Sequence, residues 1–284
     1  MIPPNISVVV PVSKDIKMAE CLQGIDEAAE IIVVLNNNPS REVYEIAKSD
    51  PRCIPIVVPG EGCNLALVLN RGVAAARNNK VLIMNSDCIA PVGLIRKMSD
   101  LLDSYEVVKA RVVFLHGTFL EYLVAETRYL FSHNFNDRRN IFGPGMAFKK
   151  EIIPKVGGYL FDEDIKWGED GDLSRRIHKA GIAHIFTSEV LEHSPETIGH
   201  DLRVAGKIGR GTRIRDYKRG LSFSAGLGSV LKSTLFDEKF HLRMAFKQDG
   251  FWIAAYLILW KIYFLFGYGT LYRNVNIKDE GYGY

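Results

Sequence analysis

Short apolar runs alternate with stretches of helical spacing along the first hundred residues. The runs are rich in Val and Ile, which favour strands, and they lie at residues 6–12, 30–36, 54–59 and 80–87. Apolar residues three or four positions apart predict helices around Met18, Leu22 and Ile25, at 41–50 and at 64–78. This alternation predicts an α/β fold with a mostly parallel sheet, helices on both faces and ligands bound beyond the carboxyl ends of the strands.

The alternation weakens after residue 100, where the segments become less regular. The pattern predicts a strand at 106–115, a helix at 118–134, a glycine-punctuated strand and turn at 142–159 and a helix at 167–181. We therefore divide the chain into a domain at 1–220, with halves at 1–100 and 101–220, and a helical tail at 221–284.

The tail contains an apolar stretch, residues 251–272, in which Lys261 is the one charged residue. About 20 apolar residues suffice to span a bilayer, whereas abundant Trp and Tyr suit the membrane interface. We expect this segment to associate with a membrane. Three arrangements stay open: a helix lying in the interface, a single span, and a helix buried in the protein core.

The composition is that of a globular protein. Of the 284 residues 47% are hydrophobic, and a net charge of +3 does not predict a nucleic-acid partner. The cysteines at 21, 53, 63 and 88 have the spacing of neither a metal module nor a disulfide framework. No secretory signal pattern opens the sequence, so we expect reduced cysteines and a location on the cytoplasmic side.

Polar residues follow two of the predicted strands, where an α/β sheet binds its ligands. Asn85, Ser86 and Asp87 end the strand at 80–87, and the Asp87 carboxylate is suited to hold Mg²⁺ and through it a diphosphate. The asparagines at 36–38 follow the second strand, and their amides suit a base or ribose edge. Both sets equally fit ordinary turns.

Three common motifs are absent from the sequence. No GxGxxG follows the first strand, and neither GxxxxGK[ST] nor GxSxG occurs. Their absence argues against a dinucleotide-binding Rossmann protein, a P-loop NTPase and an α/β-hydrolase.

Charged residues gather in two segments of the second half. Residues 203–219 hold seven basic residues, one Asp and three glycines, which predicts a mobile loop that closes over an anionic leaving group, or else a basic face on anionic lipid. Glu169 and Asp170 open the helix at 167–181, where a carboxylate can cap the helix or act as a general base. His193 suits a metal ligand or a plain strand-end residue.

The order of these segments resembles family 2 glycosyltransferases, which have the GT-A fold, a Rossmann-like sheet flanked by helices. The resemblance runs from about residue 6 to residue 219 and is densest at 70–91, NRGVAAARNNKVLIMNSDCIAP, and at 157–181. It implies a nucleotide-diphosphate sugar as donor, Mg²⁺ or Mn²⁺ as cofactor and inversion at the anomeric carbon. It also implies that the donor binds the first half of the domain and the acceptor the second.

The resemblance implies roles for individual residues. The catalytic pair is Asp170, as general base, with Glu169 beside it. The implied metal ligands are Asp87 and His193, and the implied acceptor-binding residues are Trp167 and Gly145. The implied donor-binding residues are Pro11, Val12, Asn36, Asn37, Asn70, Asn85, Ser86, Arg203, Lys207, Arg210 and Arg213.

One position departs from the family pattern, because Asn85 stands where the family has an acidic metal ligand. A catalytically inactive scaffold at the membrane is therefore an alternative. A sugar nucleotidyltransferase is another, although VPVSKD after the first strand lacks the glycine-rich phosphate loop of that class. We expect metal-assisted transfer of a single sugar to a glycan or lipid-linked acceptor at the cytoplasmic membrane face, in polysaccharide or glycoconjugate biosynthesis. The protein would be peripheral or monotopic there, or would span the membrane once through 251–272.

Overall fold

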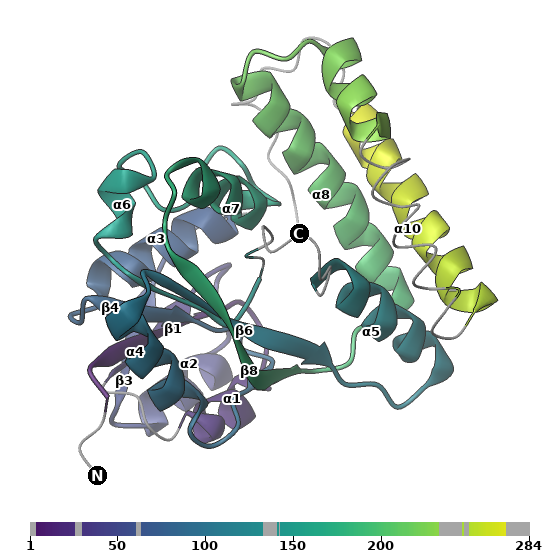
Figure 1. Ribbon diagram of the computed structural model, residues 1–284. Coiled ribbons are helices and arrows are strands. Elements are labelled where there is room, and N and C mark those ends of the chain that lie inside the picture. The colour runs from purple at the N-terminus through teal and green to yellow at the C-terminus, as the bar shows by residue number, and fades with distance from the viewer. Residues whose placement is uncertain are drawn as a thin grey trace.

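The structure is a computed structural model with one large sheet and a group of long helices to one side of it (Figure 1). The residues that it describes are 4–25, 30–60, 64–132, 141, 143–232, 246 and 250–270.

The sheet is mixed, with strand order β3-β2-β1-β4-β7-β6-β8-β5. Its strands are β1 (Ile6–Val12), β2 (Glu30–Leu35), β3 (Cys53–Val57), β4 (Lys80–Ile83), β5 (Cys88–Ile89), β6 (Val107–Phe114), β7 (Met146–Lys149) and β8 (His184–His193). The first four strands are parallel, whereas β7 runs antiparallel between β4 and β6. The predicted α/β fold with a mixed, mostly parallel sheet is confirmed.

The strand predicted at 80–87 is shorter in the structure. It ends at Ile83, and residues 84–87 form a turn that leads into the short strand β5. Ile83 pairs with Val9 on one side and with Met146 on the other. The register therefore brings the turn at 84–87 and the segment just before β7 to the same end of the sheet.

Helices cover both faces of the sheet, as predicted. One core contains side chains of α1 (Met18–Gly24), α2 (Arg41–Ser49) and α4 (Leu94–Ser104), and the other contains side chains of α3 (Leu65–Ala75), α6 (Ile152–Lys155) and α7 (Glu169–Lys179). Helix α4 was not predicted, although Leu94, Met98 and Leu102 recur every four residues and are fully buried. On α3, a Cβ at Gly72 would collide with Val9, so this glycine lets the helix lie close on the sheet.

A third core lies outside the sheet, between α5 (Phe119–Ser132), α8 (Ile198–Lys218) and α10 (Phe251–Thr270). In Figure 1, α8 and α10 run side by side, and the N-terminal half of α8 reaches α5. Two buried hydrogen bonds tie α10 to α8: the Tyr256 hydroxyl donates to Asp201 (2.6 Å) and the Tyr268 hydroxyl to Asp216 (3.0 Å). The same Asp201 carboxylate accepts from Arg128 of α5 (2.7 Å).

The prediction of a mobile loop at 203–219 is wrong, because these residues form most of α8. Thr197 caps the helix by accepting from the His200 N–H (3.3 Å). The glycines that suggested a loop serve helix packing instead. A Cβ at Gly209 would collide with the Phe264 carbonyl of α10, and one at Gly211 with the Trp167 carbonyl. Helix propensity is a weak prior, and these close contacts outweigh the cost of glycine in a helix.

Helix α10 is the one helix among the described residues that is long and apolar enough to cross a membrane; over 18 residues its mean hydropathy is 1.5, with 39% of the window buried. Length and composition alone also fit a core helix. Its inner face packs on α8 and α5 through buried side chains such as Tyr256 and Trp260, whereas its outer face is exposed and apolar. The exposed side chains are Phe251, Trp252, Ile258, Leu259, Ile262, Tyr263 and Phe266.

Candidate active site

Glu169 and Asp170 occupy the first turn of α7. Gly168 precedes the helix with φ of 79°, a left-handed conformation that glycine adopts without strain and that turns the chain into the helix. The first turn carries three acidic residues, which favours the helix because its N-terminal end is partially positive. Asp172, the third of them, forms ion pairs with Arg175 (3.0 Å) and Arg176 (2.7 Å), whereas no ion pair of Glu169 or Asp170 is found among the described residues.

The Asp170 carboxylate receives two backbone hydrogen bonds. The N–H of Gly143 donates to its Oδ2 (2.9 Å) and the N–H of Gly171 to its Oδ1 (2.7 Å). Burial raises the pKa of Asp170, and these N–H groups together with the charges of Arg128 and Lys109 oppose that rise.

Glu169 is 6% exposed and lies directly beside Asp170. Burial raises the pKa of Glu169, and the neighbouring Asp170 charge raises it further. Two carboxyl groups this close do not both ionise readily near neutral pH. Burial and mutual repulsion therefore favour a single negative charge on the pair, and the two backbone N–H groups together with Arg128 and Lys109 favour that charge on Asp170.

The turn Gly143–Gly145 connects this pair to the sheet. Gly145 donates its N–H to the carbonyl of Ile83 at the end of β4 (2.8 Å) and accepts from the N–H of Ala110 in β6 (2.7 Å). Gly145 has φ of 77°. A Cβ there would lie 3.1 Å from Leu191 and from Ala110, so the position is both left-handed and crowded.

Asp87 and His193 come together at the turn that follows β4. His193 Nε2 lies 3.4 Å from Asp87 Oδ1, because β5 pairs with β8 in a register that sets Cys88 opposite His193. The Nδ1 atom lies 2.9 Å from the Ser194 carbonyl oxygen and must donate to it, which leaves the Nε2 lone pair facing the carboxylate. A lone pair and a carboxylate at this separation suit a shared cation or a shared proton.

This turn carries further polar groups. Asp87, Cys88 and His193 each place a potential ligand atom within 4.8 Å of the others. The Ser86 hydroxyl donates to Asp15 in the loop after β1 (3.1 Å). The Asn85 carbonyl accepts from the Cys88 N–H (3.2 Å), which closes the turn.

The carboxyl ends of β1 and β2 hold the residues predicted to contact a nucleoside. Pro11 lies in β1 beyond the end of β4, whose last residue pairs with Val9, so its missing N–H breaks no bond to that strand. Asn36 donates its backbone N–H and its side-chain amide to the Val12 carbonyl (2.9 Å each). Asn37 has φ of 55°, and its Oδ1 is buried with no hydrogen-bond partner among the described residues.

The predicted basic residues of α8 divide into two groups. Arg203, Lys207 and Arg210 recur at i, i+4 and i+7, which places them on one helix face. Lys207 lies over the Trp167 ring (4.6 Å to its centroid), and burial together with the charges of Arg203 and Arg210 lowers the pKa of Lys207. Arg213 is 7% exposed and stacks on Phe223 (5.4 Å), inside the helical packing.

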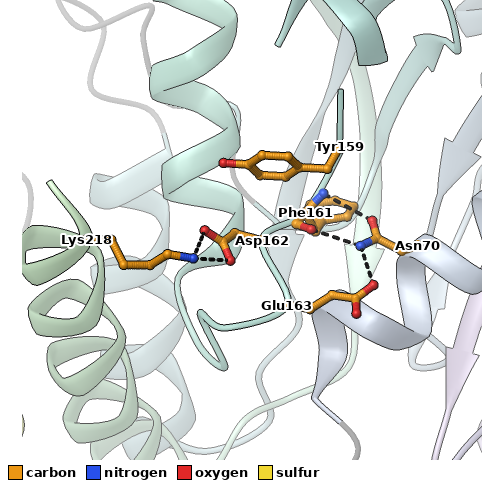
Figure 2. A pocket seen from close by; sticks show the side chains of 6 residues that line it. All are labelled: Asn70, Tyr159, Phe161, Asp162, Glu163 and Lys218. Carbon is orange, nitrogen blue, oxygen red and sulfur yellow. Dashed lines mark hydrogen bonds and ion pairs between the residues drawn. The ribbon is translucent and has the colours of Figure 1, made fainter. Parts of the chain in front are cut away.

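Asn70 lies in a pocket of about 210 Å³ between α3, the loop at 159–163 and the end of α8 (Figure 2). Its amide donates to the Phe161 carbonyl (2.9 Å) and to Glu163 (2.9 Å), and its oxygen accepts from the Phe161 N–H (3.1 Å). Figure 2 shows Lys218 bound to Asp162 on the opposite wall. With its amide engaged in this way, Asn70 anchors the loop.

The profile of glycosyl transferase family 2 matches residues 7–152, which is more than half of the chain. This chain belongs to glycosyl transferase family 2. The resemblance stated from the sequence is thereby confirmed, and the match covers β1 to the start of α6, including the Asp87 turn. A search of curated proteins gave no significant match.

Solved structures show the same fold at low identity. A crystal structure of TarS from S. aureus is 14% identical, with a TM-score of 0.52 over 72% of this family 2 chain and 39% of TarS. S. aureus TarS 1-349, alone and in complex with UDP, is 13% and 14% identical, with TM-scores of 0.49 over 73% of this chain and 65% of the other. The chain thus spans less than two thirds of these structures, and the likeness shows the fold.

Three charged residues of this family 2 domain contact or influence the site without having been predicted. Asp15 binds Ser86, whereas Lys109 and Arg128 stabilise the Asp170 charge. Lys109 and Arg111 interrupt the apolar strand VVKARVV, a pattern that places charges in a buried strand, and this signal was available in the sequence. Asp15 and Arg128 interact with segments that are distant in the sequence, and hydrophobic periodicity does not reveal such contacts.

Proposed function

We propose that this chain is an inverting glycosyltransferase that moves a single sugar from a nucleotide-diphosphate sugar to a glycan or lipid-linked acceptor, with Asp170 as general base. One observation carries the proposal. The register of β4 and β7 brings the Asp87 turn and the Gly143–Gly145 turn to one end of the sheet, and Gly143 binds Asp170. A carboxylate suited to hold a cation for the leaving group and a half-buried carboxylate suited to act as base then lie at one sheet edge, an arrangement that fits glycosyl transfer with inversion.

The base assignment rests on the electrostatics of the acidic pair. Inversion requires a carboxylate on the face opposite the leaving diphosphate, where it takes the proton of the acceptor hydroxyl. Asp170 carries the charge of the pair, and its two backbone hydrogen bonds hold the carboxylate in one orientation. Glu169 remains protonated and is positioned to donate a hydrogen bond to the acceptor. The Trp167 side chain, next to Gly168, would line the acceptor site.

The residues around Asp87 fit a divalent cation. The His193 lone pair and the Asp87 carboxylate point at each other across 3.4 Å, and the Nδ1–H donation to Ser194 is the outer hydrogen bond that metal-bound histidines make. With Asn85 in place of an acidic residue, the site offers few protein ligands, which suits Mg²⁺ or Mn²⁺ when phosphate oxygens and water complete the shell. When bound, such an ion neutralises charge on the diphosphate leaving group.

The donor nucleoside would lie against β1 and β2. The buried Oδ1 of Asn37 has no partner among the described residues, and leaving a buried acceptor unpaired costs about 1–3 kcal/mol. A donor N–H on a nucleobase would satisfy it. The α8 face formed by Arg203, Lys207 and Arg210 would bind the phosphates, because three cations share one helix face there and cations bind phosphate oxygens through charge-assisted hydrogen bonds.

The apolar outer face of α10 supports attachment to a membrane surface. Phe119 and Leu120 at the start of α5 are also exposed, and the Phe119 ring contacts Trp252 of α10 (6.4 Å between centroids). Because the inner face of α10 is bonded to α8 through Tyr256 and Tyr268, we propose that α10 lies in the interface at the cytoplasmic face. A lipid-linked acceptor would then reach the site from the same surface.

A donor screen tests the proposed activity. Purified protein with Mn²⁺ or Mg²⁺ is mixed with UDP-, GDP- and dTDP-linked sugars, and release of nucleoside diphosphate is measured with and without EDTA. We expect metal-dependent release from one donor, lost in Asp87→Ala and retained in the matched control Asp100→Ala, which removes an exposed carboxylate from α4. Donor binding without turnover, in the presence of lipid and glycan acceptors, would favour the scaffold alternative.

Vesicle flotation tests the membrane surface. The wild-type protein should float with vesicles that contain anionic lipid, because Phe, Trp and Tyr side chains partition into the interface. Ile262→Asp and Phe266→Asp on the outer face of α10 should reduce the floated fraction severalfold, whereas Val92→Asp, at a more exposed apolar position before α4, should not. Equal effects of all three variants would contradict this surface.

A further inference from the structure

Lys109 in β6 is a buried charged residue that the proposed chemistry does not use. It is 5% exposed, and its Nζ donates to the carbonyl oxygens of Ala110 (2.7 Å) and Pro144 (2.8 Å). Burial lowers the pKa of Lys109 to about 7. A neutral amine and an ammonium group both offer at least two N–H donors, so these two hydrogen bonds form in either protonation state.

The Pro144 carbonyl lies in the middle of the Gly143–Gly145 turn. On one side of it the Gly143 N–H donates to Asp170 (2.9 Å), and on the other the Gly145 N–H donates to Ile83 (2.8 Å). Lys109 therefore binds the Pro144 carbonyl. This carbonyl lies between Gly143, which contacts the base, and Gly145, which is hydrogen-bonded to the sheet. A Cβ at Gly145 would lie 3.8 Å from the Lys109 Nζ, close to the amine that binds the turn.

We propose that Lys109 is a positioning residue for the general base, which fixes the Gly143–Gly145 turn so that the Gly143 N–H points at the Asp170 carboxylate. The inference rests on the proposed function, because that function makes Asp170 the base. Lys109 acts through the turn and need not touch either substrate.

Several groups determine the charge of Asp170, and each comes from a different element. Glu169 lies beside it on α7, Arg128 approaches from α5 and Lys109 from β6, while the N–H groups of Gly143 and Gly171 donate directly. Cys88 is a further titratable group near Lys109. Loss of Lys109 would weaken the Gly143 bond and remove one cation, and both changes raise the pKa of Asp170.

Amide hydrogen exchange tests the positioning without turnover. In Lys109→Met, which keeps the length of the side chain and removes its donors, the Gly143 amide should exchange at least about tenfold faster, whereas α3 amides keep their protection. Lys80→Met is the matched control, because Lys80, in β4 of the same sheet, also binds a backbone carbonyl, that of Ser99 (2.7 Å). Unchanged exchange at Gly143 in Lys109→Met would overturn the proposal.

Kinetics with the donor that the screen identifies provide the second test. Lys109→Met should lower kcat about tenfold with little change in donor KM, and should move the acidic limb of the pH profile to higher pH. Lys109→Gln, which keeps two N–H donors on a shorter chain, should recover part of the rate. If Lys109→Met fails to fold, Lys109→Leu, which also lacks donors, takes its place in both tests.

A double variant separates this proposal from the proposed function. In the Asp170→Asn background, Lys109→Met should cause no further loss of rate, because its effect passes through Asp170. A full tenfold loss in that background would overturn the positioning role. If Asp170→Asn alone keeps the wild-type kcat, the base assignment fails, and the exchange measurement still decides whether Lys109 holds the turn.

Discussion

The two acidic centres of the site are built in opposite ways. Asp87 has a side chain 23% exposed and faces a histidine lone pair, so the centre presents ligand atoms with little positive charge of its own. Asp170 is bound by two backbone N–H groups and lies within reach of Lys109 and Arg128, beside a second carboxyl group that is buried. We expect a cation from solution to complete the first centre, whereas the charge of the second is balanced by the protein itself.

The two centres should therefore respond to different conditions in solution. Activity that depends on Asp87 should change with metal concentration, and activity that depends on Asp170 should change with pH. Each of the following variants alters one centre and leaves the other intact.

The largest effect is expected for Asp170→Asn. Removal of the general base should lower kcat by about a thousandfold, while the affinity for the donor, measured by calorimetry, changes less than about twofold. The asparagine side chain still accepts the Gly143 N–H, so the fold should be unchanged. Parallel losses of donor affinity and rate would show that Asp170 binds the donor and would break the distinction between the centres.

A smaller effect is expected for His193→Ala. If His193 is a ligand, the concentration of Mn²⁺ that gives half-maximal rate should rise about 10- to 100-fold, and saturating Mn²⁺ should restore most of the rate. His116→Ala, at an exposed histidine, serves as the control. Rate loss that no Mn²⁺ concentration repairs would indicate that His193 shares a proton with Asp87 and holds no metal.

The smallest effect is expected for Glu169→Gln, and it concerns stability. Burial and the Asp170 charge raise the pKa of Glu169 from 4.5 to about 8. An acid whose pKa is raised by folding binds more protons in the folded state. Its contribution to the free energy of unfolding is therefore lost as pH rises from about 5 to 8. Urea unfolding should therefore show Glu169→Gln gaining at least about 1 kcal/mol in unfolding free energy relative to wild type across that range.

Glu42→Gln is the control for this measurement, because Glu42 is exposed in the first turn of α2. The difference in unfolding free energy between Glu42→Gln and wild type should stay constant over the same pH range. A difference in unfolding free energy that also stays constant with pH for Glu169→Gln would mean that Glu169 is ionised in the folded protein. The charge of the pair would then have to be reassigned.

The sequence predicts the sheet well because its signal is local. Alternating β-branched runs and helical spacing specify β1 to β4 and the helices between them, and the polar residues at strand ends indicate where we expect ligands to bind. Asp87 and His193, far apart in the sequence, were paired as metal ligands from the family resemblance, and their side chains do meet in the structure. Whether they hold a metal stays a prediction.

Other features depend on contacts between distant segments and were beyond the sequence pattern. Residues 203–219 suggested a loop because of their glycines, and the structure shows that those glycines permit contact with α10 and with Trp167. Arg213 was assigned to the donor phosphates along with Arg203, yet the helical period turns it toward Phe223. Asn70 carries no pattern that distinguishes a ligand contact from an anchor for a loop.

The glycines of α8 and α10 also provide a signature by which relatives can be recognised. A side chain at Gly209 would strike α10, one at Gly211 would strike the Trp167 carbonyl, and one at Gly267 would strike Gly206. Chains that share this arrangement should keep G-x-x-G-x-G in one helix and a single glycine near the end of the last. That spacing would sort such chains from other family 2 members by inspection, even where every side chain around the active site has diverged.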